Sequence, residues 1–148
     1  MTHATSPLKH RKLDRDRDLH ELLEYLLDSA CRRQLWTLFI DHRGCLGDPV
    51  LPMADYPADP GRLVEVEGHG ALTNASLLAA AIEQQRSLSG NAAVVLVWER
   101  PGDEAMTRAD RAWAVALGRG AAQAGVPLRA QFLLHDGGLK RLRPDDLV

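Results

Sequence analysis

A run of seven apolar residues in the middle of the chain, 92–98, constrains the fold more than any other segment. Its composition of Ala, Val, Leu and Trp is typical of a β-strand that is buried on both faces. A loop follows over 99–106, and Thr107 then begins a predicted helix that ends at Gly125. In α/β proteins a loop of this kind lies at the carboxyl end of the sheet, where binding sites are usually found. We therefore expect a functional site to involve this loop.

Capping residues and alternating stretches predict the other elements of the chain. They are a helix from Asp18 (N-cap, with Glu21 at N3) to Arg32 or Arg33, a strand over 35–41, a turn over 42–44, an edge strand over 45–51, a strand over 62–67, a helix from Thr73 or Asn74 to Gly90, a strand over 128–134 and a last strand over 139–143. This order predicts a mixed β-sheet with helices on both faces, a three-layer α/β sandwich. A flavodoxin-like doubly wound sheet is the alternative, although two hairpins fit poorly into a purely parallel sheet.

The predicted helix over 107–125 has one face made mostly of small residues, which would allow close packing on a sheet. This face consists of Ala109, Trp113, Ala116, Leu117, Gly120, Ala121 and Ala124. Gly118 and Gly120 lie inside the helix, and no phosphate-binding glycine motif surrounds them. We interpret both glycines as packing positions.

Length and composition indicate one globular domain. The chain has 148 residues, of which 45% are hydrophobic and 26% are charged. Residues 1–17 are polar and mixed in charge, which predicts a flexible N-terminal arm ahead of a single domain over 18–148. A net charge of −2 gives no basic field for nucleic acid or an anionic membrane. With no apolar leader, no membrane-spanning run and no disulfide framework from Cys31 and Cys45, the cytoplasm is the expected location.

The segment from Trp98 to Asp110 resembles the core of the JAMM (MPN) metalloprotease family, in its bacterial RadC-like branch. In that family a buried strand ends in His-x-His-Pro, and Ser-x-x-Asp begins the next helix. Here the strand ends in Trp98-Glu99-Arg100-Pro101 and the helix begins with Thr107-Arg108-Ala109-Asp110, after a loop one residue shorter than usual. The resemblance in layout covers residues 35–142 and implies the same three-layer fold, which the cytidine deaminases share.

The resemblance also implies that the family's catalytic zinc site is lost. Trp98 and Arg100 stand where the two zinc-binding histidines would be, and neither indole nor guanidinium binds Zn²⁺. Asp110 stands at the third ligand and Thr107 at the family's serine, although Thr-x-x-Asp is also a helix-capping pattern. The catalytic glutamate of the family would fall near Leu51, where no acidic residue occurs. We therefore expect no catalytic residue, no metal and no cofactor.

The side chains around the former metal position form a candidate binding cleft. Its members are Trp98, Glu99, Arg100, Asp103, Thr107 and Asp110. An aromatic residue beside an arginine and carboxylates is typical of recognition rather than hydrolysis. Arg100 is predicted to form an ion pair with Asp110 or Asp103, which would fill the space that zinc takes in the family.

Different classes of function follow from these residues. The first is a metal-free, non-catalytic interaction or scaffold module that forms a homodimer or binds a protein partner through exposed sheet edges or the faces of Trp36 and Trp113. The second is a hydrolase of altered chemistry in the same cleft, with Glu99, Asp103 or Asp110 as acid or base. A third hypothesis, a DNA-repair-associated accessory protein, follows from the RadC resemblance and the cationic residues of the arm. The first is our principal hypothesis.

Overall fold

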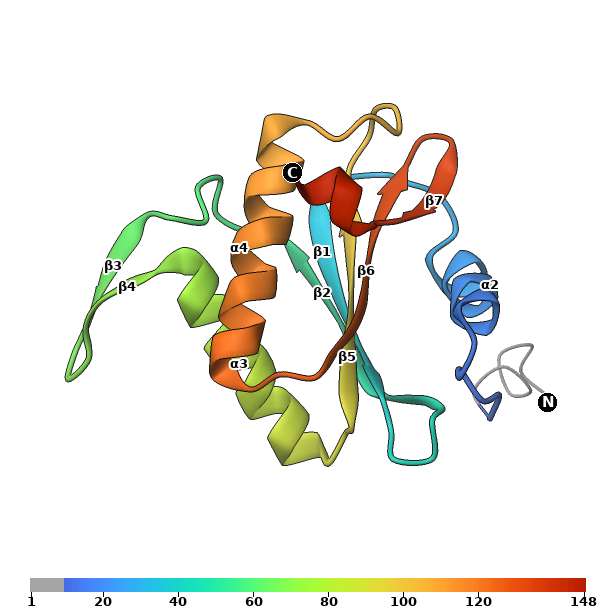
Figure 1. Ribbon diagram of the computed structural model, residues 1–148, viewed down its shortest axis with the longest axis horizontal. Coiled ribbons are helices and arrows are strands. Elements are labelled where there is room, and N and C mark those ends of the chain that lie inside the picture. The colour runs from blue at the N-terminus through green and yellow to red at the C-terminus, as the bar shows by residue number, and fades with distance from the viewer. Residues whose placement is uncertain (1–9) are drawn as a thin grey trace.

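The computed structural model describes residues 10–148 (Figure 1). Its helices are α2 (Asp16–Leu27), α3 (Asn74–Ser89), α4 (Arg108–Ala124) and the 3₁₀ helix η1 (Pro144–Leu147), and its strands are β1 (Gln34–Ile40), β2 (Leu46–Ala54), β3 (Leu63–Val66), β4 (Gly70–Thr73), β5 (Ala93–Glu99), β6 (Leu128–His135) and β7 (Gly138–Arg141). Within these residues, no helix combines the length and the apolar character that crossing a membrane requires.

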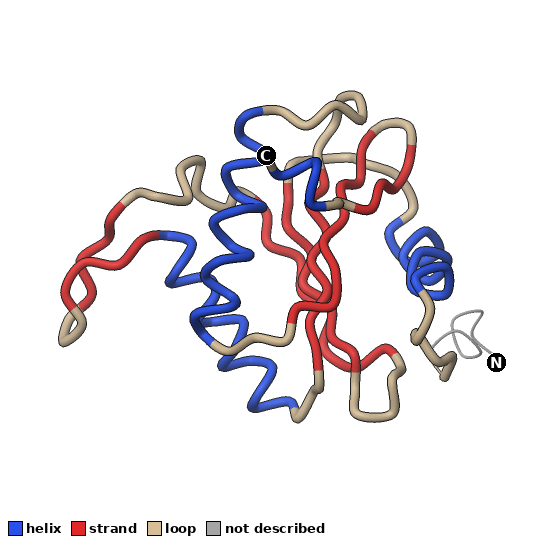
Figure 2. Tube along the Cα trace, in the orientation of Figure 1, coloured by secondary structure: helices blue, strands red, loops and turns tan. Residues whose placement is uncertain are grey.

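Five of the strands form one mixed sheet in the order β2-β1-β5-β6-β7. Strands β5 and β6 are parallel, whereas the other neighbouring pairs are antiparallel. Helix α2 lies on one face of this sheet, and α3 and α4 lie on the other (Figures 1 and 2). The predicted three-layer α/β sandwich is therefore confirmed, and the purely parallel alternative is wrong.

Strand β5 lies at the centre of the sheet because its side chains supply both cores. Val94, Leu96 and Trp98 belong to the core under α3 and α4. Val95 and Val97 belong to the core under α2. Successive side chains of a strand point to opposite faces, so a run that is apolar throughout can satisfy both layers.

Helix α4 forms as the sequence predicts, and the face that carries its small residues packs both on the sheet, through Trp113, Leu117 and Ala121, and on α3, through Gly120. The side chain of Thr107 accepts a hydrogen bond from the Asp110 amide, and Gly125 ends the helix with a φ of 79°. A Cβ atom at Gly120 would lie 3.1 Å from Ala79 Cβ and 3.3 Å from the Ala75 carbonyl oxygen, both on α3. The two helices therefore approach each other closely at Gly120.

Helix α2 begins and ends earlier than predicted. It starts at Asp16, its N-cap is Arg15, and no side chain caps it, so the predicted capping box at Asp18 is wrong. The buried Asp18 carboxylate instead forms ion pairs with Arg11 (2.5 Å) and Arg15 (3.0 Å). The helix stops at Leu27, well before the predicted end near Arg32 or Arg33.

The predicted flexible arm over 1–17 lies partly outside the described residues. From residue 10 onward this segment packs on the domain: Leu13 is buried, and its amide donates to the Gly44 carbonyl at 2.8 Å. Asp16 forms ion pairs with Arg129 on β6 and Arg141 on β7. The described part of the arm is therefore held against the sheet rather than free of it.

A second, two-stranded sheet lies apart from the main one. Strands β3 and β4 pair antiparallel as a hairpin that projects away from the body of the domain (Figures 1 and 2). Strand β3 was predicted, whereas β4 was not, because its sequence Gly-Ala-Leu-Thr has little strand character. Strand β2 is an edge strand as predicted, although it extends to Ala54.

The close approach of α3 and α4 gives the first testable expectation. Gly120→Leu inserts a branched side chain where a single Cβ already meets backbone atoms, so it should lower the free energy of unfolding by about 2–3 kcal/mol. Ala122→Leu, at an exposed position of the same helix, should change it by less than about 0.5 kcal/mol. Urea denaturation of both variants measures the difference, and equal stabilities would contradict this account of the helix pair.

Candidate functional site

The side chains of three consecutive residues at the carboxyl end of β5, Trp98 to Arg100, lie in three different environments. The first, Trp98, is a core residue. Its indole Nε1 donates to Gln131 Oε1 at 2.7 Å, inside the sheet face covered by α4. Its ring packs against Tyr56 and Trp113, with centroid distances of 5.5 and 5.9 Å. Trp98 therefore supports the candidate cleft from beneath and offers no polar atom to a ligand.

Glu99 points to the opposite face and is held by four donors. Its Oε1 accepts from the side chains of Gln34 (2.9 Å) and Trp36 (2.8 Å). Its Oε2 accepts from the amides of Cys31 (2.7 Å) and Arg32 (3.1 Å). The residue is only 2% exposed. Glu99 thus fixes the loop after α2 to the end of β5, and it does not belong to the predicted cleft.

The environment of Glu99 also fixes its charge. Burial by itself would raise the pKa of this carboxyl, but the hydrogen bonds from Trp36, the two loop amides and Gln34 outweigh it, so the pKa lies below its ordinary value. A carboxylate with every strong acceptor direction occupied and a lowered pKa is a poor general acid or base. The proposal of Glu99 as a catalytic group has no support in this geometry.

Arg100 forms the predicted ion pair with Asp110. Its Nη2 lies 2.8 Å from Asp110 Oδ2, and its Nε lies 3.2 Å from the same oxygen. The two side chains are only 14% and 12% exposed. The guanidinium also donates to the carbonyl oxygens of Asp103 (2.5 Å) and Ala105 (3.0 Å). The loop between β5 and α4 therefore wraps around this single cation.

Asp110 has a second role as the helix-capping residue that the sequence predicts. Its Oδ2 accepts from the Thr107 amide at 2.9 Å, which completes a capping box at the start of α4. Burial would raise the pKa of Asp110, but the hydrogen bonds from Arg100 and Thr107 outweigh it and the pKa lies below its ordinary value. The carboxylate is thus committed to the arginine and to the helix start.

Asp103 is the remaining carboxylate of the predicted cleft. Its Oδ1 accepts from the Ala105 amide at 3.0 Å, within the exposed loop. Its carboxylate forms no ion pair with Arg100; only its backbone carbonyl contacts the guanidinium. The alternative pairing of Arg100 with the Asp103 side chain is therefore wrong.

Two residues that sequence reasoning missed complete the wall of this site. The guanidinium carbon of Arg33 lies 3.5 Å from the ring centroid of Tyr56, a cation–π contact. Arg33 also donates to the carbonyls of Tyr56 (2.5 Å) and Pro57 (3.2 Å). Neither residue belongs to a periodic pattern, and Tyr56 lies in a proline-bracketed loop, so only its aromatic character was a signal.

A small pocket of about 190 Å³ opens between these groups. It is lined by Arg33, Tyr56, Arg100, Thr107, Ala109, Asp110 and Trp113. Of the predicted cleft residues, the structure thus brings together Arg100, Thr107 and Asp110, and it separates Trp98, Glu99 and the Asp103 side chain from them. Within residues 10–148, no group of three His, Cys, Asp or Glu side chains is arranged to hold a metal ion.

Trp113 does not provide the interaction face that the sequence suggested. Trp113 is buried, and its Nε1 donates to the Pro57 carbonyl at 2.9 Å. Trp36 is half-buried and uses its indole N–H on Glu99. The prediction of a contact surface at Trp113 is therefore wrong, because this side chain fills the core between α4 and the loop that contains Tyr56.

Comparison with known proteins adds no family to this description. The chain matches no protein-family model, and it matches none of the curated proteins. The interpretation of the site therefore depends on its geometry.

Glu99 gives a sharp test of the polar architecture. Glu99→Gln replaces an acceptor oxygen by an N–H₂ group that faces N–H donors, so it should lower the free energy of unfolding by about 2–4 kcal/mol at neutral pH. Glu104→Gln, in the exposed loop before α4, is the control and should have little effect. Denaturant unfolding at neutral pH measures both.

The lowered pKa of Glu99 predicts that the effect of Glu99→Gln on stability depends on pH. Because the folded-state pKa of Glu99 is lowered, its contribution is complete above the unfolded-state pKa of about 4.3 and is lost as the pH falls through the folded-state value. The stability difference between the parent and Glu99→Gln should therefore narrow in acid. A difference that stays constant down to the acid limit of folding would contradict this role.

The Arg100–Asp110 pair is tested by removing one charge and then both. Arg100→Ala leaves a mostly buried carboxylate uncompensated and should cost about 2–3 kcal/mol of stability. Adding Asp110→Asn removes that charge while keeping an oxygen for the Thr107 amide, so the double variant should recover part of the loss. Arg108→Ala, at an exposed position of α4, is the control. An Arg100→Ala variant as stable as the parent would show that the pair does not hold the loop.

Proposed function

We propose that this chain is a non-catalytic protein-interaction module with a JAMM-like architecture. The observation that carries the proposal is the hairpin of β3 and β4, which projects from the domain and has apolar side chains with little cover. Leu63 is 64% exposed, and Val64, Val66 and Leu72 are only half-buried. A two-stranded hairpin is marginally stable by itself, so exposing apolar residues on it has a cost that binding would offset.

Both strands of this hairpin also have an outer edge without a neighbouring strand in the described chain. Unpaired edges are templates for an added strand from another chain, and proteins that do not use them usually cover or blunt them. Glu65 in β3 and Glu67 in the turn are the only carboxylates among residues 63–73. The hairpin therefore fits a protein partner, either a second copy of this chain or another chain in extended conformation.

The carboxyl end of β5 supports the non-catalytic part of the proposal. The carboxylates that a hydrolase of altered chemistry would need are committed elsewhere: Glu99 to four donors, Asp110 to Arg100 and the helix start, and Asp103 to its own loop. The relation to the JAMM family draws its support from the order of strand, loop and capped helix around Trp98 and Arg100, and from the three-layer fold.

Two exposed leucines provide a matched test. Leu63→Asp places a charge on the hairpin, whereas Leu88→Asp places the same charge near the end of α3, where Leu88 is 76% exposed. Both sites are on the surface, so both variants should keep the parent's stability within about 0.5 kcal/mol. Leu63→Asp should weaken self-association at least tenfold, and Leu88→Asp should leave it unchanged. Sedimentation velocity over a wide range of protein concentration measures both.

The same variants separate self-association from a partner of another kind. If the parent is monomeric, the protein that co-purifies with it should be lost from Leu63→Asp and kept by Leu88→Asp. A parent that is monomeric and co-purifies with nothing, or a Leu63→Asp variant that keeps every association of the parent, would contradict the proposal.

A further inference from the structure

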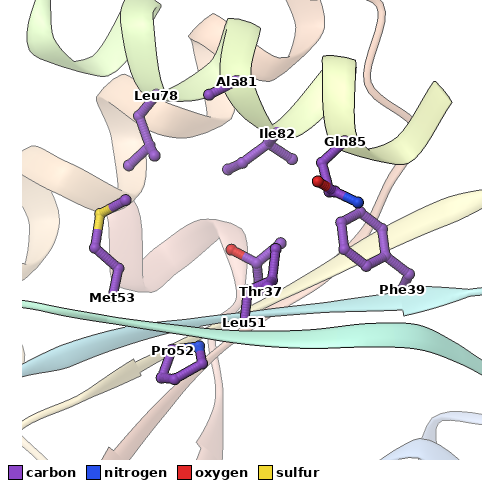
Figure 3. A pocket seen from close by; sticks show the side chains of 9 residues that line it. All are labelled: Thr37, Phe39, Leu51, Pro52, Met53, Leu78, Ala81, Ile82 and Gln85. Carbon is purple, nitrogen blue, oxygen red and sulfur yellow. The ribbon is translucent and has the colours of Figure 1, made fainter. Parts of the chain in front are cut away.

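A second concave surface lies between the sheet and α3, away from the end of β5. This α3 groove has a volume of about 330 Å³. It is lined by Thr37, Phe39, Leu51, Pro52, Met53, Leu78, Ala81, Ile82 and Gln85. Thr37 and Phe39 rise from β1 toward the helix that carries Leu78, Ile82 and Gln85 (Figure 3). The lining contains no Asp, Glu, Lys, Arg or His side chain.

The hydroxyl of Thr37 is the unusual feature of this groove. Thr37 lies on β1 between Leu35 and Phe39, in a row of side chains that face α3, and it is only 6% exposed. Its hydroxyl has no hydrogen-bond partner among residues 10–148. Every fully enclosed side-chain N or O atom in this part of the chain does have a partner. The Thr37 oxygen must therefore reach the groove itself, at its floor.

Gln85 supplies a second polar group at the wall of the groove. It is half-buried on α3, and its side-chain amide has no partner among the described residues. The Gln85 amide points from α3 toward the sheet, on the side of the groove where Phe39 lies (Figure 3). One hydroxyl and one amide in an otherwise apolar concave surface match the usual composition of small-molecule sites, in which a few polar groups fix the orientation of an apolar ligand.

We propose that the α3 groove binds a small neutral molecule with an apolar body and one hydroxyl-like group that bonds to Thr37 Oγ1. The groove volume corresponds to roughly ten water molecules at about 30 Å³ each, which suits a ligand of on the order of ten non-hydrogen atoms. A charged ligand would lose its hydration without gaining a countercharge from the lining. An added β-strand is also disfavoured on this side, because Pro49 and Pro52 interrupt edge strand β2.

Three probes of similar size separate the parts of this proposal. They are 2-naphthol, naphthalene without the hydroxyl, and 2-naphthoate with a negative charge. Titration into isotopically labelled full-length protein, followed by NMR, should shift the signals of Thr37, Leu78 and Ile82 with 2-naphthol. Naphthalene should bind more weakly, by about three- to tenfold, because one hydrogen bond is missing. Binding of 2-naphthoate should be weaker still.

Three substitutions test whether the probes bind in the groove and to the Thr37 hydroxyl. Thr37→Val keeps the shape of the side chain and removes the hydroxyl, so the affinity for 2-naphthol should fall to that for naphthalene, while the affinity for naphthalene should stay the same. Ala81→Trp fills the groove from its exposed rim and should abolish binding of both probes. Ala80→Trp, at the neighbouring exposed position outside the lining, is the control and should bind as the parent does.

The alternative outcomes overturn the proposal. Shifts from 2-naphthol that are absent, or that lie outside the groove, would show that the groove is not a ligand site. Equal binding of 2-naphthol, naphthalene and 2-naphthoate would show that Thr37 and the uncharged lining do not select the ligand. Equal losses in Ala80→Trp and Ala81→Trp would show that the effect is not local. None of these results bears on the hairpin, so the proposed function is tested separately.

Discussion

The structure depends on the burial of β5 on both faces. A strand in this position must alternate its side chains between two cores, and Val94 to Val97 do so with apolar groups alone. The same alternation also decides on which face the last two side chains of the strand lie. Trp98 turns to the face under α4, and Glu99 turns to the face of α2. Two residues that are adjacent in the sequence are thereby placed on opposite sides of the sheet, and a single cleft cannot contain both.

Each polar group at the end of β5 then organises a different segment. Glu99 accepts hydrogen bonds from the amides of Cys31 and Arg32, and so holds the segment between α2 and β1 against the end of β5. Arg100 donates to the carbonyls of the following loop and to the carboxylate of Asp110, which lies in the first turn of α4. Charged residues are stable at such depth when they are saturated with partners. Saturation also withdraws them from chemistry, because a group that holds a loop is not free to move protons.

These relations explain what could be predicted from the sequence. The β5–α4 unit was predictable because its signals are local: an apolar run, Thr107 with Asp110, and Gly125. The Arg100–Asp110 pair followed from those signals, since both ends of one short loop must lie close together. The contacts of the segment after α2 were not predictable, because the amides of Cys31 and Arg32 bind a carboxylate, Glu99, that is 67 residues or more away. The contacts of Arg33 with Tyr56 are similarly non-local.

The same reasoning explains why we propose binding surfaces away from the end of β5. The charged groups of the predicted site, Glu99, Arg100 and Asp110, are paired internally in the structure, so charge in the sequence was a poor guide to an available site. The surfaces that we propose for binding are mostly apolar: Leu63 and its neighbours on the β3–β4 hairpin, and the α3 groove with the Thr37 hydroxyl at its floor. One surface projects and suits a chain with free backbone groups, whereas the other is concave and suits a compact molecule. The two surfaces lie on different strands and share no residue.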